Sequence, residues 1–161
     1  LVAGGYRAIE SLRLEKGYRA WGSDIDPAHT PYEAGLGFCV RLGKEGGFLG
    51  REALLAQKQA GVSRRLTCLV LDGTKAVALG NEPVRVPGGE VLGRVTSGGL
   101  GYHLGASIAF AYLPVDGALP LGDGGLVADG TRLEVGVFGE WIGATVHPDP
   151  LYDPKGTRVR A

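Results

Sequence analysis

Apolar residues near the start of the chain recur at the spacing of a helix. The run between Gly5 and Gly17 contains no proline, and its apolar positions occur at roughly helical spacing. Such spacing places side chains on one face of a helix. The pattern predicts one short amphipathic helix between the two glycines. Its apolar stripe is formed by Ala8, Ile9, Leu12 and Leu14.

The following stretch mixes turn, strand and helix signals. Thr30 before Pro31 is typical of an N-cap and the first position of a single helical turn. Alternating apolar residues over 36–42 predict a strand, and residues 48–57 predict a second helix that ends before Gly61. The first sixty residues therefore indicate an α+β segment.

From about Arg64 onward, glycine and proline recur between short β-prone runs, which is typical of all-β structure. Residues 87–89 predict a hairpin turn. Six or more antiparallel strands in about ninety residues need covered or closed edges, so we expect a small barrel or a jelly-roll-like sandwich. The predicted strands are 66–71, 84–86, 91–96, 107–112, 131–138 and 141–146.

Composition narrows the function classes. The 161 residues are enough to bury roughly two thirds of the unfolded surface. Lys plus Arg and Asp plus Glu both number 17, which gives no electrostatic reason for a nucleic-acid or membrane partner. No segment approaches the roughly 18 apolar residues of a membrane span. We therefore expect a cytoplasmic protein without either partner.

The cysteines and histidines predict no redox or metal chemistry. Cys39 and Cys68 each lie in an apolar run, which favours small buried hydrophobes over a disulfide and fits a reducing compartment. His29, His103 and His147 have no metal-ligand spacing, so we expect surface or loop histidines, no zinc site and no Ser-His-Asp triad.

Residues 98–105 are rich in glycine. The glycines at 99, 101 and 105 miss the GxGxxG spacing by one position, and β-type residues follow where a helix should begin. We expect a glycine-rich connection between strands here, and no nucleotide site.

Three motifs, in order, point to a family. They are SLRLEKGYRAWGSDID at 11–26, TPYEAGLGF at 30–38 and FLGREALL at 48–55. Together they resemble the carboxy-terminal half of the folate-binding region in dimethylglycine and sarcosine dehydrogenases, which is related to the aminomethyltransferase (T-protein) of the glycine cleavage system. The form LEKGYRAWG is more similar to the dehydrogenase branch. The resemblance runs from Gly5 to about Pro150.

The resemblance implies a domain plan. Residues 1–62 would be the carboxy-terminal piece of the folate-binding, aminomethyltransferase-like domain, residues 63–150 an antiparallel β-barrel domain, and residues 151–161 a polar tail. The chain contains no Met and begins directly against the predicted helix, so we expect a fragment whose partner is the N-terminal remainder of its parent chain.

Two charged residues suit the two ends of tetrahydrofolate. A carboxylate can accept adjacent N–H donors of the pterin in a two-pronged fashion, and a guanidinium binds the carboxylates of the glutamate tail. By resemblance, Glu15 contacts the pterin and Arg51 contributes to the folate-side cavity. The alternative for Glu15 is an exposed helix-end carboxylate in a salt bridge with Lys16 or Arg19, which contributes about 0.5 kcal/mol to stability. The alternative for Arg51 is an ordinary N-terminal helix charge.

Tyr18 and Trp21 are the remaining candidates for the folate site. Either could form a wall of the cavity, and core packing is the alternative for each. We assign no catalytic residue and no metal ligand, because the acidic residue that assists the reaction in the family lies earlier in the folate domain.

The resemblance implies part of a tetrahydrofolate-dependent aminomethyl transferase-like enzyme, linked in its parent to FAD that this chain does not bind. The fragment alone should be inactive. The alternatives are a glycine cleavage T-protein proper and a non-catalytic folate-binding regulatory module.

Overall fold

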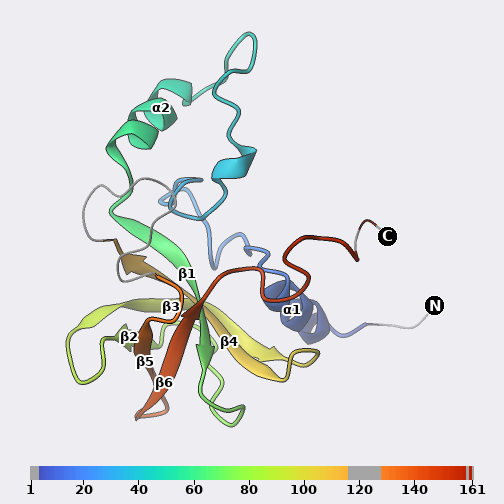
Figure 1. Cartoon of the computed structure of the whole chain (residues 1–161), viewed down its shortest axis with the longest axis vertical. Helices are drawn as coiled ribbons and strands as arrows, with labels where there is room; N and C mark the ends of the chain where they lie inside the picture. Colours follow the sequence, from blue (N-terminus) through green and yellow to red (C-terminus); the bar gives the residue numbers. More distant parts are fainter. Residues whose placement is uncertain (1–3, 116–127, 159, 161) are drawn as a thin grey trace.

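A computed structural model of the chain describes residues 4–115, 128–158 and 160. The described residues form two α-helices, a short 3-10 helix and six strands (Figure 1). In chain order these elements are α1 (Tyr6–Glu15), the 3-10 helix η1 (Gly37–Cys39), α2 (Arg51–Ala60), β1 (Arg64–Leu71), β2 (Pro83–Arg85), β3 (Val91–Gly101), β4 (Ala106–Pro114), β5 (Arg132–Val137) and β6 (Glu140–His147).

The six strands close into an antiparallel barrel. Their order is β1-β4-β3-β2-β5-β6, and β6 pairs back with β1 over Cys68–Leu71. Among the six described strands, closure leaves no edge free to pair with another chain. The α+β fold class with a small antiparallel barrel is confirmed, and the predicted hairpins β2–β3 and β5–β6 are both present.

Side chains along each strand point alternately into the barrel and away from it. The odd-numbered residues Ala109, Ala111 and Leu113 of β4 join the interior cluster with Leu69 and Leu71 of β1. Even-numbered residues of the same two strands point to the outer face, where they form a second buried cluster. That outer cluster contains Leu14, Leu66, Cys68, Ile108, Phe110 and Tyr112. One outer face of the barrel is therefore a second core, and α1 covers it through Leu14.

The buried face of α1 is not the predicted apolar stripe. Ser11, Leu14 and Glu15 are buried, whereas Ile9 and Leu12 are 59% and 62% exposed. The stripe prediction is right for Leu14 and wrong for Ala8, Ile9 and Leu12, because the helix packs on a bare stretch of β3: a Cβ at Gly99 would lie 3.0 Å from Leu14 Cδ1. Glycine on the strand, and not the helix pattern, selects which face is buried.

The predicted strand over residues 36–42 is also wrong. Its centre is the 3-10 helix η1, in which Phe38 is 83% exposed and Cys39 is exposed. Alternation alone makes no strand without a neighbouring strand to pair with. The expectation of a buried cysteine is correct for Cys68 and wrong for Cys39.

Two local predictions have mixed outcomes. Thr30 does cap a turn: its backbone N–H donates to Glu33 Oε2 at 2.8 Å while the Glu33 N–H donates to Thr30 Oγ1 at 3.3 Å, a capping box. The prediction that residues 98–105 form a glycine-rich connection between strands is wrong for residues 98–101, because β3 continues through Gly101. The turn that connects β3 to β4 is formed by residues 102–105.

The carboxy-terminal segment begins against the helix and the barrel. Leu151 packs on the outer cluster, and the Tyr152 N–H donates to the Glu15 carbonyl oxygen at 2.9 Å. Figure 1 shows this segment running beside α1, with α2 far from both. Among the described residues, neither helix has the length and apolar character needed to span a membrane.

The helix face can be tested with two leucines. Leu14→Ala should lower the free energy of unfolding by about 2–5 kcal/mol, because it leaves a cavity in the outer cluster. Leu12→Ala, on the exposed face, should change it by less than about 0.5 kcal/mol. Urea denaturation of both variants measures this, and equal losses would contradict the assigned face.

Candidate functional site

A pocket of about 420 Å³ lies where three segments meet: the last turns of α1, the β3–β4 turn at residues 102–105, and the carboxy-terminal segment. We call it the α1 pocket. Its wall combines aromatic and aliphatic side chains with cationic groups and one carboxylate. The lining residues are Ile9, Leu12, Arg13, Glu15, Lys16, Tyr18, His103 and Tyr152.

Glu15 is the most constrained member of this pocket. It is 2% exposed, and its Oε1 accepts hydrogen bonds from the backbone N–H groups of His103 at 2.8 Å and Leu104 at 3.0 Å. The expectation of an exposed helix-end carboxylate is therefore wrong. Within the described part of the chain, Oε2 accepts no hydrogen bond.

The remaining walls are fixed to the same helix end. Lys16 Nζ donates to the Asp153 carbonyl oxygen at 2.8 Å and pairs with Asp153 Oδ2 at 3.1 Å. The His103 ring meets the Tyr152 ring edge to face, with centroids 4.8 Å apart. The three segments that line the α1 pocket are thus joined to one another at Glu15 and Lys16.

Asp24 joins α1 and the loop that follows it to strand β3. Its side chain is fully buried; Oδ2 accepts from Arg13 Nη1 at 2.6 Å and from the Ala20 N–H at 3.0 Å. Its Oδ1 accepts from Thr96 Oγ1 and Ser97 Oγ, each at 2.5 Å. The pairing register shifts between Val95 and Ser97, a bulge that turns two consecutive side chains toward one carboxylate.

Arg13 links this network to the pocket. Besides Asp24, its guanidinium contacts Glu10 Oε2 at 2.8 Å and donates to Ser97 Oγ at 3.0 Å, while its side chain still lines the α1 pocket. A guanidinium held on several sides keeps a fixed orientation. Arg13 is therefore held in a fixed orientation on the pocket wall, with its charge shared between the carboxylates of Asp24 and Glu10.

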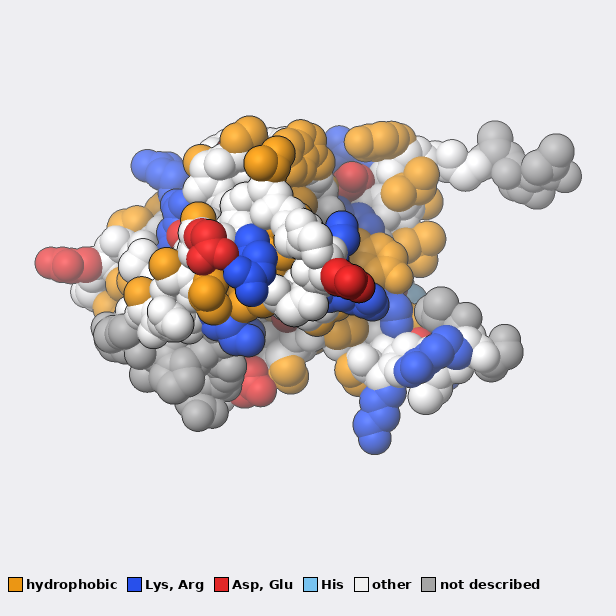
Figure 2. Space-filling model, turned by 90° about the horizontal axis from the view of Figure 1, so that it is seen from above, with side chains coloured by type: hydrophobic (Ala, Val, Ile, Leu, Met, Phe, Trp, Pro, Cys, Tyr) orange, Lys and Arg blue, Asp and Glu red, His pale blue; other side chains and the backbone are white. Residues whose placement is uncertain are grey.

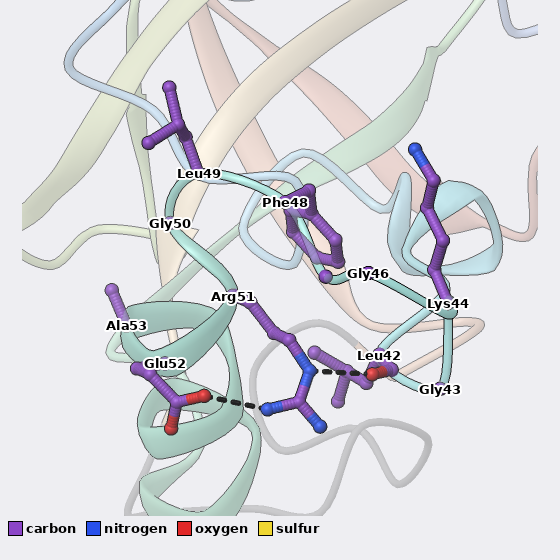
Figure 3. Close-up of a pocket in the computed structure, with 11 residues that line it drawn as sticks. Leu42, Gly43, Lys44, Gly46, Phe48, Leu49, Gly50, Arg51, Glu52 and Ala53 are labelled. Atoms are coloured by element: carbon purple, nitrogen blue, oxygen red, sulfur yellow. Dashed lines mark hydrogen bonds and ion pairs between the residues drawn. The ribbon is translucent and has the colours of Figure 1, made fainter.

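Arg51 lies in a different place. Its Nε donates to the Leu42 carbonyl oxygen at 2.8 Å and its Nη1 pairs with Glu52 at 2.6 Å (Figure 3). It lines a separate, open pocket of about 800 Å³ formed by residues 42–44 and 46–53. The structure therefore does not bring Glu15 and Arg51 into one pocket.

The two predicted aromatic residues also separate. Tyr18 is 60% exposed and lines the α1 pocket, whereas Trp21 is 73% exposed and lies outside the residues that line it. Core packing is wrong for both side chains. Of the two, Tyr18 alone lines the α1 pocket together with Glu15.

Of the two histidines outside the α1 pocket, His29 packs locally and His147 is exposed. His29 stacks on Tyr112 with centroids 4.3 Å apart, and burial raises the pKa of the Tyr112 hydroxyl to about 12. In residues 4–115, 128–158 and 160, no three His, Cys, Asp or Glu side chains gather as metal ligands would. Figure 2 shows acidic and basic side chains interspersed with hydrophobic ones over the face that it presents.

Sequence reasoning missed Lys16, His103 and Tyr152 as pocket residues. Lys16 was considered only as a salt-bridge partner of Glu15, and His103 only as a loop histidine. Tyr152 fell in a segment expected to be a polar tail. The spacing between Glu15 and His103 carries no signal, because the contact uses backbone amides 88 and 89 residues away.

Asp153 provides a pH test of the attached segment. Burial would raise its pKa, but hydrogen bonds from Lys16 and Thr157 lower the pKa to about 2. Because the pKa is lower in the folded chain, the ionised Asp153 stabilises the fold at pH values above its ordinary pKa of 3.8. This contribution is lost as the pH falls from 3.8 toward 2. Carbon NMR titration should give a midpoint near 2, and Lys16→Met should move it upward. A midpoint at the ordinary value in the unaltered chain would contradict the contact.

Comparisons with known proteins agree with this architecture. Residues 64–153 match the family model of the glycine cleavage T-protein C-terminal barrel domain, and residues 1–44 match that of the GCVT N-terminal domain. The chain is similar to the glycine cleavage system aminomethyltransferase T from Bartonella henselae, with a TM-score of 0.78 and 30% identity over 91% of this chain and 38% of that one.

Curated relatives extend the likeness to dehydrogenases. Mitochondrial dimethylglycine dehydrogenase of Rattus norvegicus is 39% identical over 156 residues, which cover 97% of this chain and 17% of the relative. Mitochondrial sarcosine dehydrogenase of Homo sapiens is 37% identical over 160 residues, covering 99% and 17%. The chain thus spans about a sixth of the length of these relatives.

Proposed function

Because the chain belongs to the family of the glycine cleavage T-protein C-terminal barrel domain, we propose that it is the carboxy-terminal part of a tetrahydrofolate-dependent one-carbon transferase-like enzyme. In this proposal the α1 pocket forms one wall of the folate site. The observation that carries it is the pocket itself, in which a buried carboxylate, a fixed guanidinium and three aromatic rings surround one cavity.

The chemistry of the pocket suits a reduced pterin. Aromatic rings from Tyr18, His103 and Tyr152 offer faces and edges for a flat heterocycle. Oε2 of Glu15 can accept one of the adjacent N–H donors on the pterin edge. Since Oε1 already serves two backbone amides, recognition by this residue is one-pronged, and the two-pronged fork expected from the sequence is not the arrangement that we propose.

The glutamate tail of the ligand would reach cationic groups. Arg13 is the guanidinium that lines the α1 pocket, and Arg51 lies in its separate pocket, already paired with Glu52. Both guanidinium groups are already paired, Arg13 with the carboxylates of Asp24 and Glu10, so we propose Arg13 only as the nearer of the two to an anionic group bound in the α1 pocket. Arg51 remains a candidate for the far end of a long folate tail.

Exposed apolar residues on α1 suit the partner proposed for this chain. Ile9 and Leu12 of α1 and Tyr18 just after it line the α1 pocket but stay more than half exposed, and the family model of the N-terminal domain matches residues 1–44. We propose that the preceding part of a parent chain packs here and supplies the acidic group for transfer, while FAD would belong to a more distant part of a dehydrogenase parent. The alternatives are a T-protein proper and a non-catalytic folate-binding module.

The folate proposal is tested by calorimetric titration of the chain with folinic acid. We expect saturable binding that Glu15→Gln weakens about 10- to 100-fold, because the new amide presents a donor to a ligand donor while its oxygen can still accept from His103 and Leu104. Glu140→Gln, at an exposed carboxylate on β6, should leave affinity unchanged.

Two results would overturn parts of this proposal. No binding by the unaltered chain would mean that the α1 pocket is not a folate site in this chain. Binding that is equally tight in Glu15→Gln would remove Glu15 from ligand contact and leave it a structural residue.

A further inference from the structure

Glu15 joins the three segments that form the α1 pocket. Its carboxylate accepts from the amides of His103 and Leu104 in the β3–β4 turn, and its carbonyl oxygen accepts from the Tyr152 N–H at 2.9 Å. One helix-end residue thus contacts the barrel through its side chain and the carboxy-terminal segment through its main chain. The rings of His103 and Tyr152 then meet at 4.8 Å over the cavity.

This contact depends on the absence of a side chain at Gly101. A Cβ there would lie 2.9 Å from both Cγ and Oε1 of Glu15 and 2.8 Å from Ile108 Cδ1. Ile108 is fully buried in the outer cluster, so it offers little room to shift. A methyl group at Gly101 must therefore displace the Glu15 carboxylate from the turn.

From these contacts we infer that Gly101 is a positioning residue for the α1 pocket, and that the barrel takes part in ligand binding through the β3–β4 turn that Glu15 clamps. Gly101 fixes where Oε1 lies, Oε1 fixes the backbone of His103 and Leu104, and that backbone places the His103 ring on the pocket wall. The inference rests on the proposed folate site for its ligand, while the contact between Glu15 and the turn is observable without one.

A second glycine supplies a matched control. Gly99 lies two residues earlier on the same face of β3, and a Cβ there would meet only Leu14 Cδ1, at 3.0 Å. Leu14 is also buried, but this single contact at 3.0 Å is relieved by a shift of a few tenths of an ångström, whereas a Cβ at Gly101 would lie under 3.0 Å from three atoms. Gly99→Ala should therefore disturb the same helix–strand packing without moving the Glu15 carboxylate.

Amide hydrogen exchange measures directly whether the Glu15 carboxylate holds the β3–β4 turn, an interaction that we call the clamp. In Gly101→Ala and Glu15→Ala, the amides of His103 and Leu104 should exchange at least tenfold faster than in the unaltered chain, because they lose their acceptor. Gly99→Ala should keep their protection, and Glu15→Gln should keep most of it because its amide oxygen still accepts. Amides in the middle of β4, such as that of Phe110, report that the barrel remains folded in every variant.

Folinic acid binding to the same proteins completes the test. Gly101→Ala should weaken binding at least tenfold, and Gly99→Ala should change it less than twofold. Unchanged protection of His103 and Leu104 in both Gly101→Ala and Glu15→Ala would overturn the clamp, whether or not folate binds. Normal protection with no folate binding by the unaltered chain would instead reject the folate site and leave the clamp a purely structural contact. If Gly101→Ala does not fold, Glu15→Ala, which adds no atoms, decides the same question.

Discussion

The buried carboxylate of Asp24 is the constraint on which the placement of the opening segment depends. An ionised carboxylate without water is stable only when donors surround it. Asp24 has four: a guanidinium from α1, a backbone amide at Ala20, and two hydroxyls from the bulged part of β3. Because these donors come from the helix, the following loop and the barrel, satisfying one charge requires all three to be in register.

The same logic recurs at the end of α1, where Glu15 meets two amides of the β3–β4 turn. Leu14, which precedes Glu15 in the chain, enters the outer cluster, so an apolar contact lies next to this polar one on the helix. This arrangement orients the helix without using its exposed leucine and isoleucine. It leaves Arg13, Lys16 and Tyr18 around a cavity whose other walls come from the barrel turn and the carboxy-terminal segment.

Much of the barrel could be predicted from the sequence, because alternation and turn residues report each strand locally. The same alternation misled at residues 36–42, where no strand lies beside Phe38 to pair with. The buried face of α1 could not be predicted from the helix alone, since Gly99 and Gly101 on a distant strand decide it. Resemblance directed attention to Glu15, yet the meaning of its burial depends on backbone amides, which have no sequence signature. His103 and Tyr152 were missed because only the fold brings them together.

The central claim is that the end of α1, the β3–β4 turn and the carboxy-terminal segment form one ligand site. Its most direct test is a map of backbone amide chemical shifts in the isotope-labelled chain during titration with a reduced folate. The account predicts changes concentrated at Tyr18, His103 and Tyr152, with the barrel interior unaffected. Changes confined to the open pocket around Arg51, or no changes at saturating ligand, would contradict it.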